Sequence, residues 1–405
     1  MPRLTALALA VHAALLATPA SAQTADRVLQ EIRVSASRTG ATQSASIGGF
    51  NELPLVDTPA SVSVLTREQM QDLRIRTTTD AARFDASIND SYNAVGYAEQ
   101  FSIRGYALDN AYGYRKDGLS IPADAAIPLE NKERIEVLKG LAGLQAGQSA
   151  PGGIVNYVVK RPTALPLRSA TVEVSERGTV YGAIDVGGRS DDARFGYRFN
   201  ASAERLRSVV RGADGKRHFV GAAFDWRLSD RALLELDADY QYRSQLTVPG
   251  FQLFNGTDLP RVEADTMLNN QPWSKPVATD SANLGARFTY KLDAGWAFTA
   301  SANAHQFERD DYAAFPYGCT GQFLYPGYCG NGDYDVYDYQ STGERKSPRA
   351  FNAMVQGSVS TAGVRHALTF GASASRRRDA YGDYVYETGS ATDFISNVYR
   401  PRAVP

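Results

Sequence analysis

From Leu167 onward, apolar and polar residues alternate with a period of two in long segments. This alternation puts the two kinds of side chain on opposite faces of a β-strand, and the segments are longer than the usual strand of a water-soluble protein. The second half of the chain is therefore predicted to form one large antiparallel sheet. About nine segments follow the pattern, at 167–177, 179–190, 194–208, 217–229, 232–246, 278–292, 295–309, 348–360 and 365–378.

The connections between these segments alternate in length. Short turns at one end of a sheet and long loops at the other are typical of an outer-membrane β-barrel. A water-soluble all-β domain is the alternative, because frequent Tyr and Gly residues fit both classes. The short turns lie at 190–192, 229–231, 293–295 and 361–363, and the long connections at 209–216, 247–277 and 310–347.

The two faces of the segment 296–307 differ in character. One face is apolar or small and is expected to contact lipid, with Trp226, Trp296 and tyrosines near strand ends at the membrane interfaces. The other face is more polar and is expected to line the lumen. The first set is Trp296, Phe298, Ala300, Ala302 and Ala304, and the second is Ala297, Thr299, Ser301, Asn303 and His305.

Residues 1–22 have the features of a signal peptide: Arg3, an apolar run from Leu4 to Leu16, and the small residues Ala20-Ser21-Ala22 before the expected cleavage. A retained membrane anchor is the alternative. After Gln23 no apolar stretch reaches the roughly 18 residues of a transmembrane helix, so any membrane span is predicted to be a β-strand.

Residues 23–50 are small and polar and are predicted to be flexible. Within them, residues 31–36 alternate in polarity, and such a run can add itself as an edge strand to a partner's sheet. An ordinary linker is the alternative interpretation. The run consists of Glu31, Ile32, Arg33, Val34, Ser35 and Ala36.

Residues 51–162 are predicted to form a separate mixed α/β module. Strands are expected at 59–65, 101–106, 134–138 and 154–159, with a tightly turned Gly-rich loop at 140–153. Thr66 and Gln69 fit a capping box at the start of one helix, and a second helix is expected to begin near Thr79 or Asp80.

Cys319 and Cys329 are the two cysteines of the chain, and both would follow the signal peptide into an oxidising compartment. A disulfide between them is predicted. A metal site is the weaker alternative, because the four histidines are scattered and none is near this pair in the sequence.

Neither the charge balance nor the motifs indicate an enzyme or a nucleic-acid-binding protein. Lys and Arg (43) nearly equal Asp and Glu (44), so no net field favours a polyanion. No GxSxG, HExxH or Walker motif occurs, and the Gly-rich run 147–153 does not lead into a Lys-Ser/Thr helix start. No catalytic residue, metal site or resident cofactor is therefore predicted.

Four linked motifs resemble the plug domain of TonB-dependent outer-membrane receptors, especially their ferric-siderophore branch. The likeness extends over about residues 28–378, and the run 31–36 is similar to the TonB box of that family. The motifs are FSIRGY at 101–106, DGLSI at 117–121, ERIEVLKG at 133–140 and SAPGGIVNYVVKRP at 149–162.

The resemblance implies a plug inside a barrel of about 22 strands in the Gram-negative outer membrane. It implies an iron(III)–siderophore chelate as ligand, bound at the outer face, and energy supplied through TonB, with ExbB and ExbD acting indirectly. It also implies a monomer surrounded by outer-membrane lipid. Receptors for haem, cobalamin or a carbohydrate are the alternatives.

The resemblance also implies which residues meet the ligand and which hold the plug. Two plug apices flank the FSIRG strand and carry aromatic side chains suited to a chelate; the alternative is that these residues only fill the gap between plug and barrel. Arg104 and Lys139 match basic positions that dock the plug on barrel glutamates, with Glu133 or Glu136 as alternative partners. The apex residues are Tyr92, Asn93 and Tyr97 before the strand, and Tyr106, Asp109, Asn110, Tyr112 and Tyr114 after it.

Two departures from the family pattern stand out. Leu141 follows Lys139-Gly140 where the family has proline, and little effect is expected. The stretch 163–405 holds about nine strands of the roughly 22 that such a barrel needs. The sequence therefore resembles the front part of a receptor, and a non-transporting remnant is the alternative to a transporter.

Overall fold

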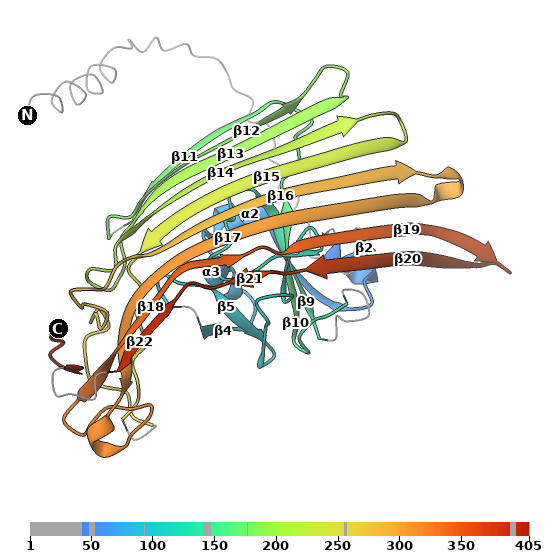
Figure 1. Cartoon of the computed structure of the whole chain (residues 1–405). Coiled ribbons are helices and arrows are strands. Elements are labelled where there is room, and N and C mark those ends of the chain that lie inside the picture. Colours follow the sequence, from blue (N-terminus) through green and yellow to red (C-terminus); the bar gives the residue numbers. More distant parts are fainter. Residues whose placement is uncertain are drawn as a thin grey trace, which may run out of the picture. The chain divides into compact units, whose positions relative to one another are not determined.

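The computed structural model describes residues 43–47, 53–92, 94–140, 147–175, 177–254, 257–388 and 394–404, all within one unit, Gly40–Pro405. The predicted signal peptide, the TonB box at 31–36 and Asn93 lie outside the described residues. Figure 1 shows a large antiparallel sheet with a smaller module of strands and helices against one of its faces.

From β11 to β18 the large sheet follows chain order, each strand pairing antiparallel with the one before it. Its first strands agree with the predicted segments to within a few residues. They are β11 (Leu167–Val174), β12 (Val180–Arg189), β13 (Phe195–Leu206), β14 (Gly215–Arg227), β15 (Ala232–Gln245), β16 (Val277–Lys291) and β17 (Ala297–Gly318), with a 3₁₀ turn, η3 (Asp293–Gly295), between the last two.

The eighth and ninth strands of the sheet are each divided into shorter pieces, which together pair along the preceding strand. Each such set of pieces is called a run here. β18 (Asp333–Lys346) pairs with the second half of β17 and β19 (Arg349–Thr361) with its first half, so the two form one run broken at 347–348, where Pro348 has no N–H to donate. Four pieces make up the ninth run. The described residues therefore contain nine runs, as predicted. The pieces are β20 (Val364–Arg376), β21 (Asp379–Ala380), β22 (Tyr384–Thr388) and β23 (Ile395–Asn397).

The prediction of one long loop at 310–347 is wrong. β17 runs on to Gly318 and β18 begins at Asp333, so only 319–332 connects them. The pairing of these strands shifts register between Arg309 and Asp311 and again between Pro316 and Gly318. Each shift adds one residue to one of the two strands and reverses the phase of the alternation along it, so the pattern of two breaks although the strands continue.

The two faces of the sheet differ as the alternation requires. Along β14, Arg217, Phe219 and Asp225 are buried on the side of the module, whereas Val220 and Trp226 are more than half exposed. Asn303 and His305 are buried on the same inner side, which confirms the predicted lumen face of β17. Among the described residues, no helix is long and apolar enough to cross a membrane.

The smaller module has one sheet of five strands and one of three. The first has the order β3-β9-β10-β7-β8, in which β10 pairs antiparallel with β9 and parallel with β7; the second has the order β4-β5-β6. Their bounds are β3 (Ser61–Thr66), β4 (Ile88–Tyr92), β5 (Gln100–Ile103), β6 (Tyr106–Ala107), β7 (Tyr114–Lys116), β8 (Leu119–Ser120), β9 (Lys132–Lys139) and β10 (Gly153–Val159).

Two short helices pack on this module, each started by a capping box. The Thr66 side chain accepts a hydrogen bond from the Gln69 amide at the start of α2 (Arg67–Asp72), as the sequence predicts. Thr77 and Asp80 cap α3 (Thr78–Ala82) in the same way. The helices enclose an apolar core in which Phe101, Tyr114 and Tyr157 are almost fully buried.

The chain enters the module through residues 43–47. Here β1 (Ser44–Ala45) pairs with β2 (Leu53–Pro54), which a 3₁₀ turn, η2 (Leu55–Asp57), follows. The backbone N–H and the hydroxyl of Ser46 donate to Glu136 Oε1 at 2.9 and 3.0 Å. Glu136 lies in β9 with no exposed area, so this entry segment is fastened to the interior of the five-stranded sheet.

Candidate functional site

Ion pairs join the module to the inner face of the large sheet, and most of them are buried. Each pairs a residue of 51–162 with a charged residue on an inward-facing strand position, where the low dielectric requires a partner for every charge. Sequence reasoning missed these contacts, because nothing local to either residue indicates its partner. The pairs are Arg76–Glu173, Lys116–Asp237, Asp124–Lys346, Glu130–Arg217, Lys160–Asp185 and Arg161–Asp225.

Glu130 lies at one of these contacts with an 8% exposed side chain, and its Oε1 is 2.5 Å from Arg217 Nη2. Ser202 donates to the same oxygen at 3.0 Å. Burial by itself would raise the pKa of Glu130, but the Arg217 guanidinium outweighs it and lowers the pKa to about 2. Glu130 therefore stays ionised and fixes the module to β14.

Arg104 and Lys139 contact the module itself and not the sheet. Lys139 Nζ lies 2.7 Å from Asp85 Oδ2, and Arg104 Nη2 donates to Ser61 Oγ at 3.3 Å. Lys139 lowers the pKa of Asp85 despite the opposing effect of burial. Neither the predicted pairing with barrel glutamates nor the alternative with Glu133 or Glu136 is found among the described residues.

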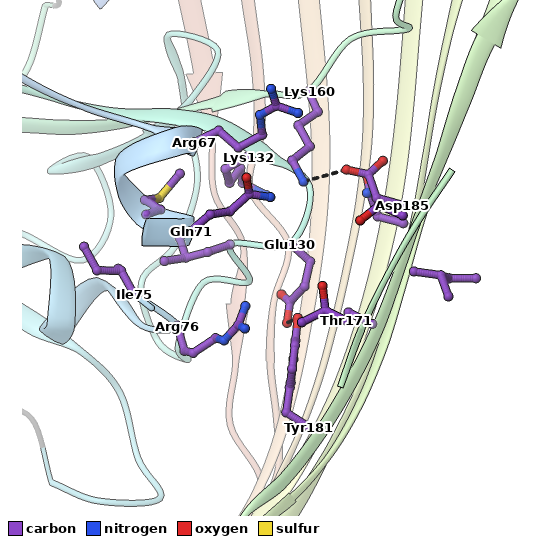
Figure 2. A pocket seen from close by; sticks show the side chains of 16 residues that line it. Arg67, Gln71, Ile75, Arg76, Glu130, Lys132, Lys160, Thr171, Tyr181 and Asp185 are labelled. Atoms are coloured by element: carbon purple, nitrogen blue, oxygen red, sulfur yellow. Dashed lines mark hydrogen bonds and ion pairs between the residues drawn. The ribbon is translucent and has the colours of Figure 1, made fainter. Parts of the chain in front are cut away.

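A polar cavity of about 80 Å³ lies between the module and strands β11 to β13. Figure 2 shows side chains that line it. Lys160 donates to Asp185 at 2.9 Å on one side of it, and the Arg76 guanidinium lies 4.1 Å from the ring centre of Tyr181 on another. Most of the charged groups around this cavity form ion pairs, so the cavity belongs to the contact between the module and the sheet.

Tyr92 and Tyr97 lie together at the end of the module that meets the long connections of the sheet. The Val95 carbonyl accepts from the amide of Val248 at 3.0 Å, in the connection between β15 and β16. The rings of Tyr92 and Tyr97 contact edge to face with centres 6.0 Å apart, and Tyr92 is 53% exposed. This end of the module is therefore the predicted outer apex.

A set of aromatic side chains on β17, β18 and β22, here called the aromatic wall, faces this apex. The wall consists of Phe315, Tyr337, Tyr339 and Tyr384. Phe315 and Tyr337 are cross-strand partners with ring centres 4.7 Å apart, and Tyr339 and Tyr384 contact at 6.3 Å. Because cross-strand partners and alternate residues share a face, these rings point to the same side of the sheet as the buried Asp311.

Arg309 connects the wall to the apex. Its guanidinium lies 4.6 Å from the ring centre of Tyr97, and its Nη2 is 2.5 Å from Glu344 Oε2. Burial raises the pKa of Tyr97 well above its ordinary value, with Arg309 opposing that rise. The phenol therefore stays neutral and can donate or accept a hydrogen bond. The site combines rigid aromatic surface with one fixed cation.

The remaining predicted apex residues divide into two groups. Asp109, Asn110 and Tyr112 are partly exposed in the loop after β6, where Asp109 Oδ1 accepts from the Ala111 amide at 2.7 Å. The prediction that Tyr114 belongs to a ligand-binding apex is wrong: its side chain is fully buried in the core, and its hydroxyl accepts from the Phe101 amide at 3.0 Å.

The structure separates Tyr106 from the apex formed by Tyr92 and Tyr97. It follows the Arg104–Gly105 turn at the far end of β5, beside Gly152 and near the residues that hold Arg104. Tyr106 follows the FSIRG motif in sequence but does not lie near the outer connections. Strand β5 runs away from Tyr92, which pairs with Gln100, and Tyr106 pairs with Ile103 at the opposite end of that strand.

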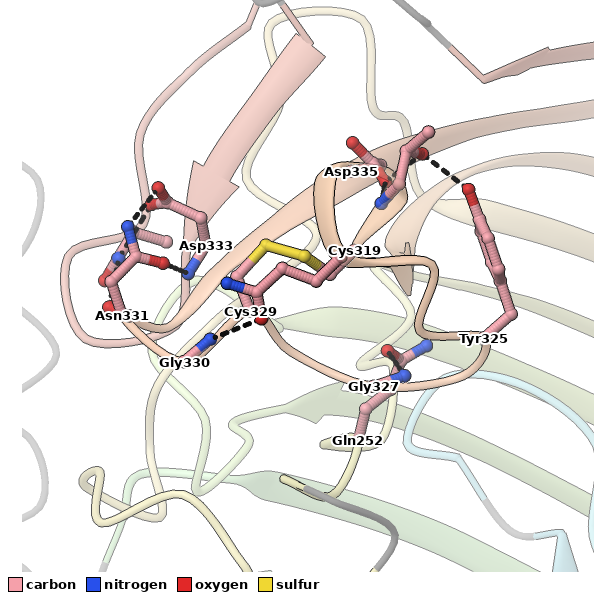
Figure 3. Close-up of a disulfide and its surroundings, with 12 residues drawn as sticks. Gln252, Cys319, Tyr325, Gly327, Cys329, Gly330, Asn331, Asp333 and Asp335 are labelled. Carbon is pink, nitrogen blue, oxygen red and sulfur yellow. Dashed lines mark hydrogen bonds between the residues drawn. A yellow bond between two sulfur atoms is a disulfide. The ribbon is translucent and has the colours of Figure 1, made fainter.

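Cys319 and Cys329 form the predicted disulfide in the connection between β17 and β18, which also holds a 3₁₀ turn, η4 (Thr320–Gln322). Figure 3 shows this loop and its anchor, Gln252, whose Oε1 accepts from the Gly327 amide at 2.9 Å. Tyr328, in the same loop, packs on Leu268 and Val398 from two other connections. The outer connections thus form one packed layer.

The sequence was compared with families of known proteins. Residues 54–154 match the TonB-dependent receptor plug domain, which lies within the predicted module 51–162. The boundaries of that module at 51 and 162 and of the barrel part at 163–405 stay predictions.

Curated relatives are siderophore receptors. The chain is 28% identical to a ferrichrome receptor of Yersinia enterocolitica, over 65% of this chain and 35% of the relative. It is 22% identical to the ferrichrome outer membrane transporter and phage receptor of Escherichia coli, over 90% of this chain and 51% of the relative. It spans between about a third and a half of the length of such relatives. Their names describe receptors and transporters, not enzymes.

Solved structures show the same fold. The ferric-catecholate import receptor Fiu of Escherichia coli aligns with a TM-score of 0.75 at 17% identity, over 90% of this chain and 56% of that one. The ferric preacinetobactin receptor of Acinetobacter baumannii aligns with a TM-score of 0.75 at 22% identity, over 86% of this chain and 51% of that one. Residues 54–154 therefore belong to the TonB-dependent receptor plug domain family, and the chain has the fold of Gram-negative outer-membrane receptors, with the plug domain lying against nine strand runs in the described residues.

Proposed function

We propose that the protein binds a ferric siderophore at its outer face and imports it with energy supplied through TonB, without a catalytic step of its own. The observation that carries this proposal is the meeting of the plug apex with the aromatic wall across Arg309. A chelate of this class offers flat, weakly hydrated surfaces around a buried iron, which rigid aromatic rings can cover at little entropic cost. The iron is cargo and not a resident cofactor.

The proposed ligand site can be tested by direct binding. Purified protein is titrated with ferrichrome, a ferric tricatecholate, haem and cobalamin, with quenching of tryptophan fluorescence as the signal. We expect binding of a ferric siderophore, and a loss of affinity of about tenfold or more in Tyr97→Ala and Tyr339→Ala. Tyr290→Ala is the matched control, because Tyr290 lies next to the short turn at 292–296 and far from the apex along β16. Binding of haem or cobalamin alone would replace the siderophore in this proposal.

The proposed partner TonB can be tested separately, through the run 31–36. β-Addition needs consecutive backbone N–H groups, which proline interrupts. In iron-starved cells that make the protein, Ile32→Pro is expected to abolish uptake of radioactive iron chelate and to leave chelate binding unchanged. Ser35→Ala retains the backbone donor and is the control. Uptake that persists in Ile32→Pro would rule out 31–36 as the TonB-binding strand.

A further inference from the structure

Arg205 on β13 and Lys216 on β14 are direct cross-strand partners on the outward face of the large sheet, and both side chains are exposed. Like charges in such a pair have Cβ atoms about 4.5–5.5 Å apart and destabilise the sheet. In the described part of the chain Arg205 forms no hydrogen bond or ion pair, and the Lys216 ammonium only lies over the Tyr242 ring, 5.7 Å from its centre. The two cations therefore repel each other, and an anion between them would remove that repulsion.

His218 and Tyr242 extend this pair toward the middle of the strands. His218 follows Lys216 by two residues, about 6.6–6.8 Å along β14, and Tyr242 is its cross-strand partner on β15. Their rings stack with centres 6.5 Å apart, and neither side chain has a hydrogen bond among the described residues. Arg205, Lys216, His218 and Tyr242 are here called the outward cluster. It presents a guanidinium, an ammonium, an imidazole and a phenol to the surroundings of the sheet.

The described carboxylates around the outward cluster are engaged elsewhere. Asp214, in the connection that follows β13, pairs with Arg207. Glu204 is adjacent to Arg205 in sequence but points to the inner face, where it binds a plug-facing arginine. Asp280 faces outward on β16, two strands away from β14, and already accepts from a tyrosine hydroxyl. The positive charge of the cluster is therefore not neutralised by the described part of the chain.

Exposed apolar side chains continue the outward face beyond the cluster. They form the band that contacts acyl chains in an outer-membrane barrel. Arg205 and Lys216 lie at the other side of the cluster, next to the connection 207–214, at the end of the sheet where the long outer connections are. The outward cluster therefore lies at the outer edge of the apolar band, where lipid head groups begin. The apolar residues, 44–78% exposed, include Val172, Ile184, Phe199 and Val220.

We propose that the outward cluster binds a phosphate monoester of a phosphorylated glycolipid in the outer leaflet. Such a phosphate carries a charge of about −1.5 to −2 and three acceptor oxygens, which match the adjacent guanidinium and ammonium. The acyl chains of the same molecule cover the apolar band, so both parts of the lipid meet a matching surface. A free phosphate ion would use the cations alone. The inference is independent of the proposed siderophore and rests on the orientation of the sheet in the membrane.

The test compares two lipids that share the same acyl chains. Lipid A carries phosphate monoesters, and its dephosphorylated form lacks them. With the full chain in detergent, native mass spectrometry measures the fraction of protein that retains each lipid. We expect lipid A to bind about tenfold or more tightly than the dephosphorylated lipid. Arg205→Gln combined with Lys216→Gln is expected to abolish that preference and to leave the affinity for the dephosphorylated lipid unchanged.

A matched control removes two exposed cations from the opposite end of the sheet. Arg168 lies at the start of β11 and Arg227 at the end of β14, both beside short turns. Arg168→Gln combined with Arg227→Gln lowers the net charge by the same amount and should retain the preference for lipid A. Loss of the preference in this control as well would overturn the outward cluster as the site, because net charge alone would then explain the binding.

Three further outcomes would overturn the proposal. Equal binding of the two lipids by the unaltered protein, which needs no variant to fold, would show that the phosphate is not recognised. A preference that persists after both Arg205 and Lys216 are replaced would assign the phosphate to another site. Displacement of lipid A by excess sodium phosphate would show an anion site that does not require the lipid. Binding of a ferric siderophore should be the same in all these variants, so that function is tested separately.

Discussion

Glu130 shows how a single side chain can tie the plug to the barrel wall. Its carboxylate lies between Arg217 of β14 and the hydroxyl of Ser202 on β13, with an 8% exposed side chain. Arg217 has a second partner in Glu204 at 3.0 Å. The contact therefore joins two neighbouring strands to one residue of the plug and depends on Glu130 remaining ionised.

This dependence predicts a loss of plug docking in acid. The pKa of Glu130 is about 2 in the folded protein and about 4.5 in the unfolded chain, so its contribution is complete above pH 4.5 and is lost as the pH falls toward 2. The shift corresponds to about 3 kcal/mol at neutral pH. Glu130→Gln should be less stable at pH 7 and should lose less stability in acid, as measured by protease resistance of the plug between pH 7 and 3.

Glu263→Gln, in an exposed connection, is the control for this prediction and should retain the acid sensitivity of the unaltered protein. An equal acid response in Glu130→Gln and the unaltered protein would mean that other carboxylates govern docking in this range.

At the scale of single elements, the sequence predicted the sheet well and its interruptions poorly. The alternation located β11 to β17 because each face of those strands has one environment along its length. It failed at β18, where the bulge at Gly343 and the shift near Pro316 reverse the phase of the pattern. Helix α2 was predicted because its capping box, Thr66 and Gln69, is entirely local.

Gly153 provides an element-scale prediction at the start of β10. A Cβ atom there would lie 1.9 Å from the Leu138 carbonyl oxygen, and the φ of 132° disfavours any other residue. Gly153→Ala should therefore separate β10 from β9 and destabilise the plug by on the order of 3 kcal/mol or more. Thermal unfolding of the plug, followed by protease sensitivity, measures the effect.

Gly182→Ala in β12 is the matched control, since its Cβ would meet nothing within 4 Å and its φ is not positive. It should change stability by no more than about 0.5 kcal/mol. Similar behaviour of the two variants would show that the backbone at Gly153 adjusts at little cost.

At the scale of the whole molecule, docking of the plug uses contacts that sequence reasoning could not find. Lys116 and Asp237 are 121 positions apart and form a buried pair with side-chain exposures of 3% and 9%. Motifs identify the plug, and the alternating pattern identifies the strands of the large sheet. Which charged residue of the plug pairs with which charged residue of the sheet depends on the register of the complete sheet. For the same reason the positions of Arg104 and Lys139 within a motif did not reveal Asp85 as the partner of Lys139.

The Lys116–Asp237 pair predicts strong coupling between plug and wall. Lys116→Met leaves Asp237 buried without its partner and should destabilise the docked plug by about 3–5 kcal/mol. Lys116→Met combined with Asp237→Leu removes both charges and should recover most of that loss. Urea unfolding of the four members of this double-mutant cycle gives the coupling energy. Additive losses in the double variant would show that the two side chains do not act as a pair.

The hydrogen bonds between Ser46 and Glu136 determine where a force applied to the preceding chain would act on the plug. Strand β9, which carries Glu136, lies between β3 and β10, and the same carboxylate accepts from Asn156 of β10 at 3.0 Å. Tension on Ser46 therefore arrives in the middle of the five-stranded sheet and not at its rim. A load applied there strains the central ladders first, so the plug would yield from its interior outward.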